Sequence, residues 1–275
     1  ILDKLELYNC DVTDSAQFES VFLSVMPDEV YHLASKVQTS LIFEEEKDAF
    51  DGNFLGVLNC LHAIKKFKNN CRLYCAGSCL MFGKIYTSPQ NEDTPMNPTT
   101  PYGIGKVAAY HFVKMYREAY GIFACTGVLF NHESPRRDDI FLPKKITKAV
   151  ANIKMGKQEK LFLGDIETSR DWGYAGDVVE SMWLMLQQKK PEDFVIGTNE
   201  LHSIRELLEI SFGYLDLDWK NYVVSDPNLF RKIDYVNLCG DSSKARDKLG
   251  WLPKVKFKAL IEQMVKYDYK QASEK

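Results

Sequence analysis

The sequence lacks the two features that most often mark a membrane or nucleic-acid protein, which are a long apolar run and a large excess of one charge. None of its apolar stretches approaches the ~20 residues of a membrane-spanning helix, and the chain as it stands shows no signal peptide. Its 275 residues carry a formal net charge of -3, which gives no general attraction to nucleic acid or to an anionic membrane. We therefore expect a cytoplasmic protein that binds neither.

Residues at metal-ligand spacing are also missing. The chain has seven cysteines and five histidines, but no Cys-x-x-Cys pair and no cluster of histidines completes a ligand set. Three of the cysteines, Cys71, Cys75 and Cys79, follow one another at intervals of four residues. An odd number of cysteines in a chain without an export signal is typical of reduced, mostly buried thiols. We expect no metal site and no disulfide.

What the sequence does contain is an alternation of short apolar segments with helical patterns. With 45% hydrophobic and 27% charged residues, the chain can bury one large core or two unequal lobes. The apolar periodicity predicts strands at residues 5–11, 30–34, 73–76, 123–130 and 194–197. It predicts helices at residues 53–65, 102–120, 144–155 and 256–270. Such alternation predicts an α/β fold with a parallel, doubly wound sheet, whose ligands bind at the carboxyl ends of the strands.

The most informative local feature is a tyrosine and a lysine four residues apart. Tyr102 and Lys106 follow Pro101 at the start of a predicted helix, and four residues make about one turn, so their side chains share one face. In a cleft, the ammonium group favours the phenolate form of the tyrosine, which can then exchange a proton with a sugar hydroxyl. Taken alone, this spacing more often marks an exposed pair than a catalytic one.

Ser78 adds a third polar group to the candidate site. It ends an apolar run from Leu73 that finishes in small residues, as a buried parallel strand does when it delivers a hydroxyl to a cleft. The alternative is a hydroxyl that only satisfies a backbone group at the strand end. Together, Ser78, Tyr102 and Lys106 predict one site that oxidises an alcohol with a nicotinamide.

Longer motifs then make a family resemblance specific. The stretches that carry it are Ser78, Thr100 to Lys106, Leu129 to Arg137, Arg170 to Gly173 and Val179 to Leu186. In them the chain resembles the extended short-chain dehydrogenase/reductases, and within these the GDP-mannose 4,6-dehydratase family. The resemblance implies a Rossmann dinucleotide-binding lobe at residues 1–130 and about 170–197. It also implies a smaller, interleaved α/β substrate lobe at residues 131–169 and about 198–275.

The resemblance implies an NADP-dependent reaction on GDP-mannose or a related GDP-sugar. In this family, C4 of the hexose is oxidised, water is lost across C5 and C6, and C6 is reduced, so the cofactor is regenerated. By resemblance, Tyr102 is the base that takes the hydroxyl proton. Lys106 tunes Tyr102 and binds the nicotinamide ribose, and Ser78 hydrogen-bonds the C4 oxygen.

The resemblance also implies binding residues and an assembly. The cofactor-binding residues that it implies are Asp11, Val12, Leu33, Ala34, Ser35, Lys106, His132 and Arg137. The substrate-binding residues that it implies are Asn131, Lys145, Arg170 and Arg231. Guanidinium forks suit the paired oxygens of a diphosphate. In relatives the loop that carries Arg137 reaches a neighbouring subunit, so we expect a homodimer or homotetramer.

One departure from the family pattern concerns the dinucleotide. A Rossmann domain normally opens with a strand, a Gly-x-x-Gly-x-x-Gly loop and a helix whose N-terminus binds the pyrophosphate. This sequence has no such loop, and Gly103 and Gly105 do not replace it because they lie inside the predicted Tyr102 helix. We expect an N-terminally truncated Rossmann sheet. Either the sequence is a fragment of a longer chain, or the protein has lost its tight grip on the dinucleotide.

The second departure concerns the dehydration step. The family supplies a glutamate two residues after the serine, and this sequence has Leu80 there. The string from Ser78 to Gly83 keeps its length and its terminal glycine, which indicates a substitution. An apolar side chain cannot move the proton that the loss of water requires. Three functions therefore stay open: the dehydratase, a GDP-sugar 4-dehydrogenase or epimerase, and a catalytically silent paralogue that binds a nucleotide-sugar.

Overall fold

The computed structural model describes residues 4–35, 46–85, 87–229 and 238–274. The chain forms two compact units. Unit 1 comprises Ile1–Tyr86, Glu92–Val128 and Met182–Phe194, and unit 2 comprises Thr87–Asn91, Leu129–Ser181 and Val195–Lys275. Within the described ranges, no helix combines the length and the apolar character that crossing a membrane requires.

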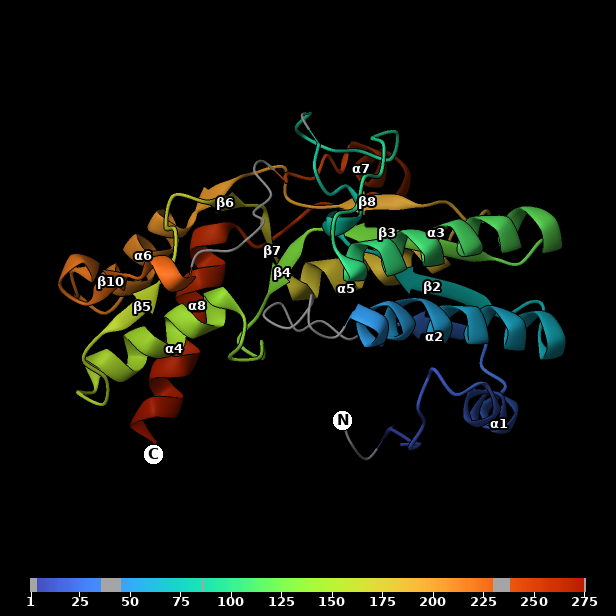
Figure 1. The fold of residues 1–275 in the computed structure, drawn as a ribbon, viewed down its shortest axis with the longest axis horizontal. Coiled ribbons are helices and arrows are strands. Elements are labelled where there is room, and N and C mark those ends of the chain that lie inside the picture. The colour runs from blue at the N-terminus through green and yellow to red at the C-terminus, as the bar shows by residue number, and fades with distance from the viewer. Residues whose placement is uncertain (1–3, 36–45, 86, 230–237, 275) are drawn as a thin grey trace. The chain divides into compact units, whose positions relative to one another are not determined.

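Unit 1 is built on a parallel sheet (Figure 1). The strands of the sheet are β1 (Glu29–His32), β2 (Arg72–Ala76), β3 (Ala124–Leu129) and β8 (Phe194–Ile196), in the order β1-β2-β3-β8. Only the first residue of β8 belongs to unit 1. β2 pairs in parallel with β1 and with β3, which places the carboxyl ends of these strands at one edge. β3 is buried along its whole length, as expected for a parallel strand covered on both faces. The predicted α/β fold and parallel sheet are confirmed.

Helices supply the apolar layer that covers this sheet. They are α1 (Ser15–Val25), α2 (Glu46–Phe67) and α3 (Pro101–Tyr120). α2 packs along α3, and the side chains fully buried between helices and sheet include Val57, Leu61, Ile64, Leu73 and Val113. Burial of each such side chain contributes roughly 1.5–3 kcal/mol. The core of unit 1 therefore holds α3 in place beside the sheet.

The ends of α3 follow from local sequence signals. The Thr100 hydroxyl oxygen accepts a hydrogen bond from the Gly103 amide at 3.0 Å, and Pro101 occupies the first turn, where its missing amide proton costs nothing. The helix ends at Gly121, whose φ of 66° lies in the left-handed region that glycine adopts readily. The predicted helix and its end at Gly121 are confirmed.

The strand predicted at residues 5–11 is wrong. No strand forms there, and the side chains of Leu5 and Leu7 are 54% and 81% exposed. The alternation of apolar and polar residues is present, but the described residues offer this segment no neighbouring strand with which to pair its backbone groups. Just after this segment, Asp14 accepts hydrogen bonds from the amides of Ala16 and Gln17 and caps α1.

Unit 2 packs helices around a second core. Its helices include α4 (Leu142–Lys154), α6 (Ile204–Gly213), α7 (Ser243–Leu249) and α8 (Phe257–Ser273), and α5 (Ala175–Leu186) runs on into unit 1. Short strand pairs accompany them: β4 (Asn131–Glu133) with β7 (Trp172–Tyr174), β5 (Leu161–Leu163) with β10 (Val223–Ser225), and β6 (Ser169–Arg170) with β9 (His202–Ser203). Buried side chains from α4, α6 and α8, such as Ile146, Leu207 and Leu260, form the core.

A buried ion pair links α4 to the C-terminal helix α8. The Lys144 ammonium bonds the carboxylate of Asp268, and both residues are 6% exposed. The Thr147 hydroxyl donates to the same carboxylate at 2.7 Å, and Lys144 also donates to the Pro135 carbonyl at 2.8 Å. Each charged group in this network is therefore paired, which offsets the cost of taking it out of water.

Breaking this buried pair should be costly. Asp268→Asn removes the negative charge and leaves the Lys144 ammonium buried without a counter-charge, so we expect a loss of about 3–5 kcal/mol in the free energy of unfolding. Urea denaturation measures it. The matched control is Asp139→Asn, which breaks the exposed pair with Lys148 and should cost about 0–1 kcal/mol. Equal losses in the two variants would contradict this account of the α4–α8 contact.

Candidate functional site

The first part of the candidate site lies where β2 ends. Ser78 follows Ala76, the last residue of β2, by two positions and caps a short 3₁₀ turn, Cys79–Met81. Its hydroxyl oxygen accepts a hydrogen bond from the Leu80 amide at 3.2 Å. The side chain is partly exposed. The hydroxyl thus has a backbone partner, as the alternative of a purely structural hydroxyl requires, and it belongs to a partly exposed residue just beyond the carboxyl end of the strand.

The start of α3 packs against this turn. A Cβ atom on Gly103 would lie 2.7 Å from the Leu80 carbonyl oxygen, closer than such atoms approach, so only glycine allows the helix to come this near. Tyr102 precedes this glycine and is 7% exposed. The Lys106 ammonium lies 5.7 Å from the centroid of the Tyr102 ring. The two side chains therefore share one face of the helix, as their spacing predicts.

Lys106 is tied directly to the end of β2. Its ammonium donates a hydrogen bond to the Ala76 carbonyl at 2.8 Å, although the residues lie 30 positions apart. Lys106 is only 3% exposed, and no carboxylate of the described chain forms an ion pair with it. A buried charge normally has a counter-charge. The structure thus brings Lys106 and Ser78 to the same end of one strand.

His32, at the end of β1, is a buried polar residue that the sequence analysis did not single out. It is 5% exposed, and neither ring nitrogen has a hydrogen-bond partner within the described residues. Burial and, as a smaller contribution, the positive charge of Lys106 together lower the pKa of His32 to about 4. The imidazole is therefore neutral at physiological pH. The effect of Lys106 on this pKa shows that its ammonium acts electrostatically on the end of β1.

The other expected cofactor residues of unit 1 lie near this edge or before α1. Leu33, Ala34 and Ser35 directly follow β1, and the Ser35 hydroxyl donates to the Asn53 side-chain oxygen at 2.7 Å. Asp11 accepts hydrogen bonds from the amide and hydroxyl of Thr13 at 2.9 and 2.8 Å. Val12 approaches Gly56 of α2, the glycine that the His32 ring also contacts.

The remaining expected residues belong to unit 2. Asn131 and His132 form part of β4, and His132 Nδ1 lies 2.9 Å from the Phe130 carbonyl oxygen. The Lys145 ammonium donates to the Phe162 carbonyl at 3.1 Å. One terminal nitrogen of Arg170 donates to the carbonyl of its neighbour Ser169 at 2.7 Å. The expected substrate residue Arg231 lies outside the described residues.

Asp171, in the same motif as Arg170, has a role that the sequence analysis missed. Its carboxylate is fully buried and accepts hydrogen bonds from the amides of Thr198, Asn199 and Gly240 at 2.9 to 3.2 Å. Burial raises the pKa of Asp171, and these hydrogen bonds oppose that rise. The carboxylate fixes the segment that follows β8 to the segment around Gly240. The signal available in the sequence was a single acidic residue within the Arg170 to Gly173 motif.

The described part of the chain contains no set of side chains that could bind a metal ion. No three side chains from histidine, cysteine, aspartate or glutamate gather there closely enough to hold a metal ion.

Comparison with known proteins assigns the family. A model of the GDP-mannose 4,6 dehydratase family matches residues 1–264. The chain is 46% identical over 272 residues to GDP-mannose 4,6 dehydratase 2 of Arabidopsis thaliana, which covers 98% of this chain and 73% of that protein. It is 39% identical over 283 residues to the Homo sapiens GDP-mannose 4,6 dehydratase, with 96% and 76% covered.

Solved structures agree on the fold. RMD from Pseudomonas aeruginosa, complexed with NADPH, superposes with a TM-score of 0.87 at 23% identity, over 96% of this chain and 87% of that one. The Bordetella bronchiseptica enzyme WbmG, in complex with NAD and UDP, superposes with a TM-score of 0.81 at 26% identity, over 98% and 81%. From the family match and the identities, this chain belongs to the GDP-mannose 4,6-dehydratase family.

Proposed function

We propose that this protein is an NADP-dependent enzyme that acts on GDP-mannose by oxidation at C4, loss of water across C5 and C6, and reduction at C6. The family and its named relatives support the substrate and the reaction. The observation that carries the proposal is the buried Lys106 ammonium, bonded to the Ala76 carbonyl beside Ser78 and one turn from Tyr102. Such a cation beside a phenol and a hydroxyl is suited to proton transfer from an alcohol.

The polar groups of unit 1 fit a nicotinamide dinucleotide. In open α/β sheets, dinucleotides bind at the carboxyl ends of the strands. At this edge, Lys106 has a carbonyl as its partner but no carboxylate, and His32 has two buried ring nitrogens without a partner in the described chain. Among the structural relatives, WbmG binds NAD. The choice of NADP over NAD rests on the family resemblance.

Each residue of the proposed site has a distinct task. When bound, the nicotinamide supplies hydride transfer, from C4 and later to C6. The Lys106 charge stabilises the phenolate form of Tyr102, and this phenolate accepts the proton of the C4 hydroxyl and becomes a phenol. The Ser78 hydroxyl donates a hydrogen bond to the C4 oxygen and holds it toward Tyr102. Because Tyr102 is nearly buried, water competes little for its proton.

Leu80 supports a second candidate function. Leu80 is partly exposed and lies two residues after Ser78, at the position where the family resemblance places the acid of the dehydration step. Without a proton-moving group there, C4 oxidation would continue while the loss of water slows. A GDP-sugar 4-dehydrogenase or epimerase is therefore the alternative that a specific residue favours.

We also propose that the two units bind different ligands. We assign dinucleotide binding chiefly to unit 1, through Asp11, Val12, Leu33, Ala34, Ser35 and Lys106. We assign nucleotide-sugar binding chiefly to unit 2, through Asn131, Lys145, Arg170 and Arg231. His132 and Arg137 of unit 2 are assigned to the cofactor. A guanidinium fork can grip two diphosphate oxygens at once, which favours the arginines for that contact.

The proposed function is tested by product analysis of the full-length protein with GDP-mannose and NADP. A product that has lost one water supports the dehydratase, and a 4-keto or epimerised product of unchanged hydration supports the alternative. GDP-mannose binding without turnover would support a silent paralogue, and the enzymatic proposal would be abandoned.

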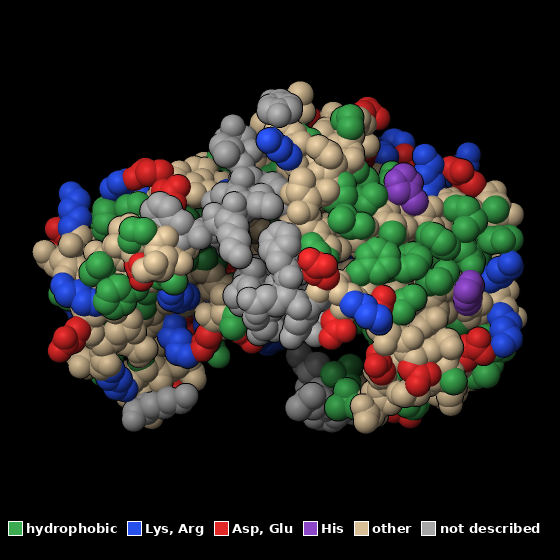
Figure 2. All heavy atoms as spheres, viewed as in Figure 1, with side chains coloured by type: hydrophobic (Ala, Val, Ile, Leu, Met, Phe, Trp, Pro, Cys, Tyr) green, Lys and Arg blue, Asp and Glu red, His purple; other side chains and the backbone are tan. Residues whose placement is uncertain are grey.

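The proposed assembly is a homodimer or homotetramer in which a second copy covers the outer face of α2 and α3. Figure 2 shows hydrophobic side chains gathered on unit 1. Ile104 and Met115 are 47% and 39% exposed, and Phe50, Phe54 and Phe112 form a partly exposed aromatic cluster between the two helices.

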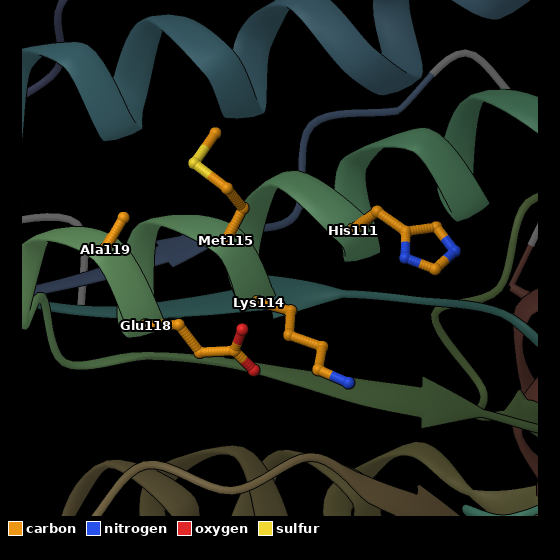
Figure 3. Close-up of a pocket in the computed structure, with 5 residues that line it drawn as sticks. All are labelled: His111, Lys114, Met115, Glu118 and Ala119. Carbon is orange, nitrogen blue, oxygen red and sulfur yellow. The ribbon is translucent and has the colours of Figure 1, made fainter.

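A shallow pocket of about 460 Å³ lies on α3 within this face, lined by His111, Lys114, Met115, Glu118 and Ala119. In Figure 3, Met115 points to the α2 side of the helix, and Lys114 and Glu118 point to the opposite side. An apolar surface rimmed by charged groups is typical of an interface.

A charge introduced on this face should weaken the assembly. Met115→Lys places an ammonium in the apolar surface, and we expect the dissociation constant of the dimer to rise at least about tenfold. Analytical ultracentrifugation measures this. The matched control, Leu23→Lys, alters an exposed leucine of α1 that is 48% exposed and should leave the assembly unchanged. Unchanged sedimentation of Met115→Lys would exclude this face as the interface.

A further inference from the structure

A buried glutamate lies next to the arginine that is assigned to the cofactor. Glu133, the last residue of β4, is 2% exposed, and its Oε2 lies 3.3 Å from Nε of Arg137. Burial raises the pKa of Glu133 to about 7, and the positive charge of Arg137 opposes that rise. A carboxyl group is rarely buried to this extent, and the family resemblance gives Glu133 no role.

A second contact fixes the plane of the same guanidinium. The central carbon of the Arg137 guanidinium lies 3.5 Å from the centroid of the Phe141 ring, in cation–π contact. Glu133 thus forms an ion pair with one edge of the group, without a hydrogen bond between Oε2 and Nε, and Phe141 covers one face. The chain between them is also held, because Arg137 donates its amide to the Ser134 carbonyl at 3.0 Å and the Pro135 carbonyl accepts from Lys144 at 2.8 Å.

These contacts leave the two terminal nitrogens of the Arg137 guanidinium available to bind a ligand. Of its three nitrogens, only Nε is fully buried. The two terminal nitrogens make no hydrogen bond to the described residues, and the whole side chain is 29% exposed. Two terminal nitrogens side by side form the donor pair that binds two oxygens of a phosphate. Fixing such a group before the ligand arrives reduces the entropy lost on binding.

We infer that Glu133 is a positioning residue: its carboxylate, with the Phe141 ring, orients Arg137 so that the terminal nitrogens present a fixed fork to a phosphate of the dinucleotide. This inference rests on the proposed function, which assigns Arg137 to the cofactor. Glu133 itself contacts no ligand. The groups that face it are Arg137 from the loop and, across the strand pair, Tyr174 of β7; its neighbour His132 points to the opposite face of the strand.

If Glu133 orients Arg137 through its charge, its effect on NADPH binding should depend on pH. Well above pH 7 the carboxyl is ionised and attracts Nε of Arg137, and well below pH 7 it is neutral and resembles a glutamine. Glu133→Gln should therefore bind NADPH about tenfold more weakly than the wild type at pH 8, and equally at pH 6. The phosphate's own titration is the same in both proteins, so it cancels in the comparison.

Fluorescence titration of the full-length protein with NADPH at both pH values measures these affinities. The matched control is Glu167→Gln, which removes an exposed carboxylate paired with Arg205 and should change neither affinity. Phe141→Leu removes the ring but keeps an apolar side chain, and it should also weaken NADPH binding at pH 8. This second variant keeps the inference testable if Glu133→Gln fails to fold.

The outcomes separate the inference from the proposed function. A difference at pH 8 that vanishes at pH 6 supports it. Equal affinities at pH 8, tighter binding by Glu133→Gln, or the same loss at both pH values would each overturn it, the last because a structural defect is not relieved by protonation. If the wild type binds no NADPH, both the proposed cofactor and this inference fail. If it binds NADPH with no effect of Glu133, only the inference fails.

Discussion

Tyr102→Phe is expected to lower the turnover of GDP-mannose about 10²- to 10⁴-fold, the usual contribution of a general acid or base. The substitution removes the phenolic oxygen, which accepts the C4 hydroxyl proton in the proposed mechanism, and keeps the ring. Tyr102 is nearly buried at the first turn of α3, beside the Lys106 ammonium. The phenylalanine ring fills the same space, so folding and NADPH binding should stay close to those of the wild type.

Steady-state kinetics measure this loss, and NADPH titration shows whether the cofactor still binds. Tyr120→Phe is the matched control, since Tyr120 lies on the same helix, is 42% exposed and packs its ring against Lys65. We expect it to retain full turnover. A Tyr102→Phe variant as active as this control would remove the phenol from the mechanism and, with it, the oxidation of C4 at this site.

Leu80→Glu is expected to speed the loss of water from the C4-oxidised sugar about 10²- to 10⁴-fold, because it supplies an acid–base group next to Ser78. The position tolerates a charge, since the Leu80 side chain is partly exposed and its contacts to Ser78 and to the start of α3 are made by backbone atoms. The backbone that positions Ser78 should therefore remain unchanged.

Mass spectrometry of the GDP-sugar product over time measures the rate of water loss. Leu80→Gln is the matched control, because it adds a polar side chain of the same length that cannot carry a proton, and it should leave the rate near that of the wild type. If Leu80→Glu dehydrates no faster, then another group already serves this step, or the protein performs no dehydration.

The strands and helices that build the site could be predicted because each carries its own local signal. β2 and β3 are short apolar runs bounded by turn residues, and α3 carries a cap at Thr100 and a stop at Gly121. The segment at residues 5–11 also alternates apolar and polar residues but forms no strand. The alternation shows only that one segment could be a strand, whereas a sheet also requires a neighbouring strand to pair with its backbone groups. Pairing partners are not visible in a local pattern.

The contacts that give the site its chemistry were less accessible from the sequence. The bond between Lys106 and the Ala76 carbonyl joins residues 30 positions apart and depends on how α3 packs beside β2. The pair of Glu133 and Arg137 has helical spacing but lies at the end of a strand. The burial of His32 follows from its tertiary surroundings, since nothing in its neighbouring residues distinguishes it from an exposed histidine.

The closeness of Gly103 to the Leu80 carbonyl also bears on how such sites are recognised in other genomes. A methyl group at position 103 would collide with backbone atoms, which cannot swing aside as a flexible side chain does. A search pattern that fixes only a tyrosine and a lysine four residues apart accepts many unrelated helices. Requiring a glycine directly after the tyrosine would reject most of them and retain chains in which the helix can approach the serine turn.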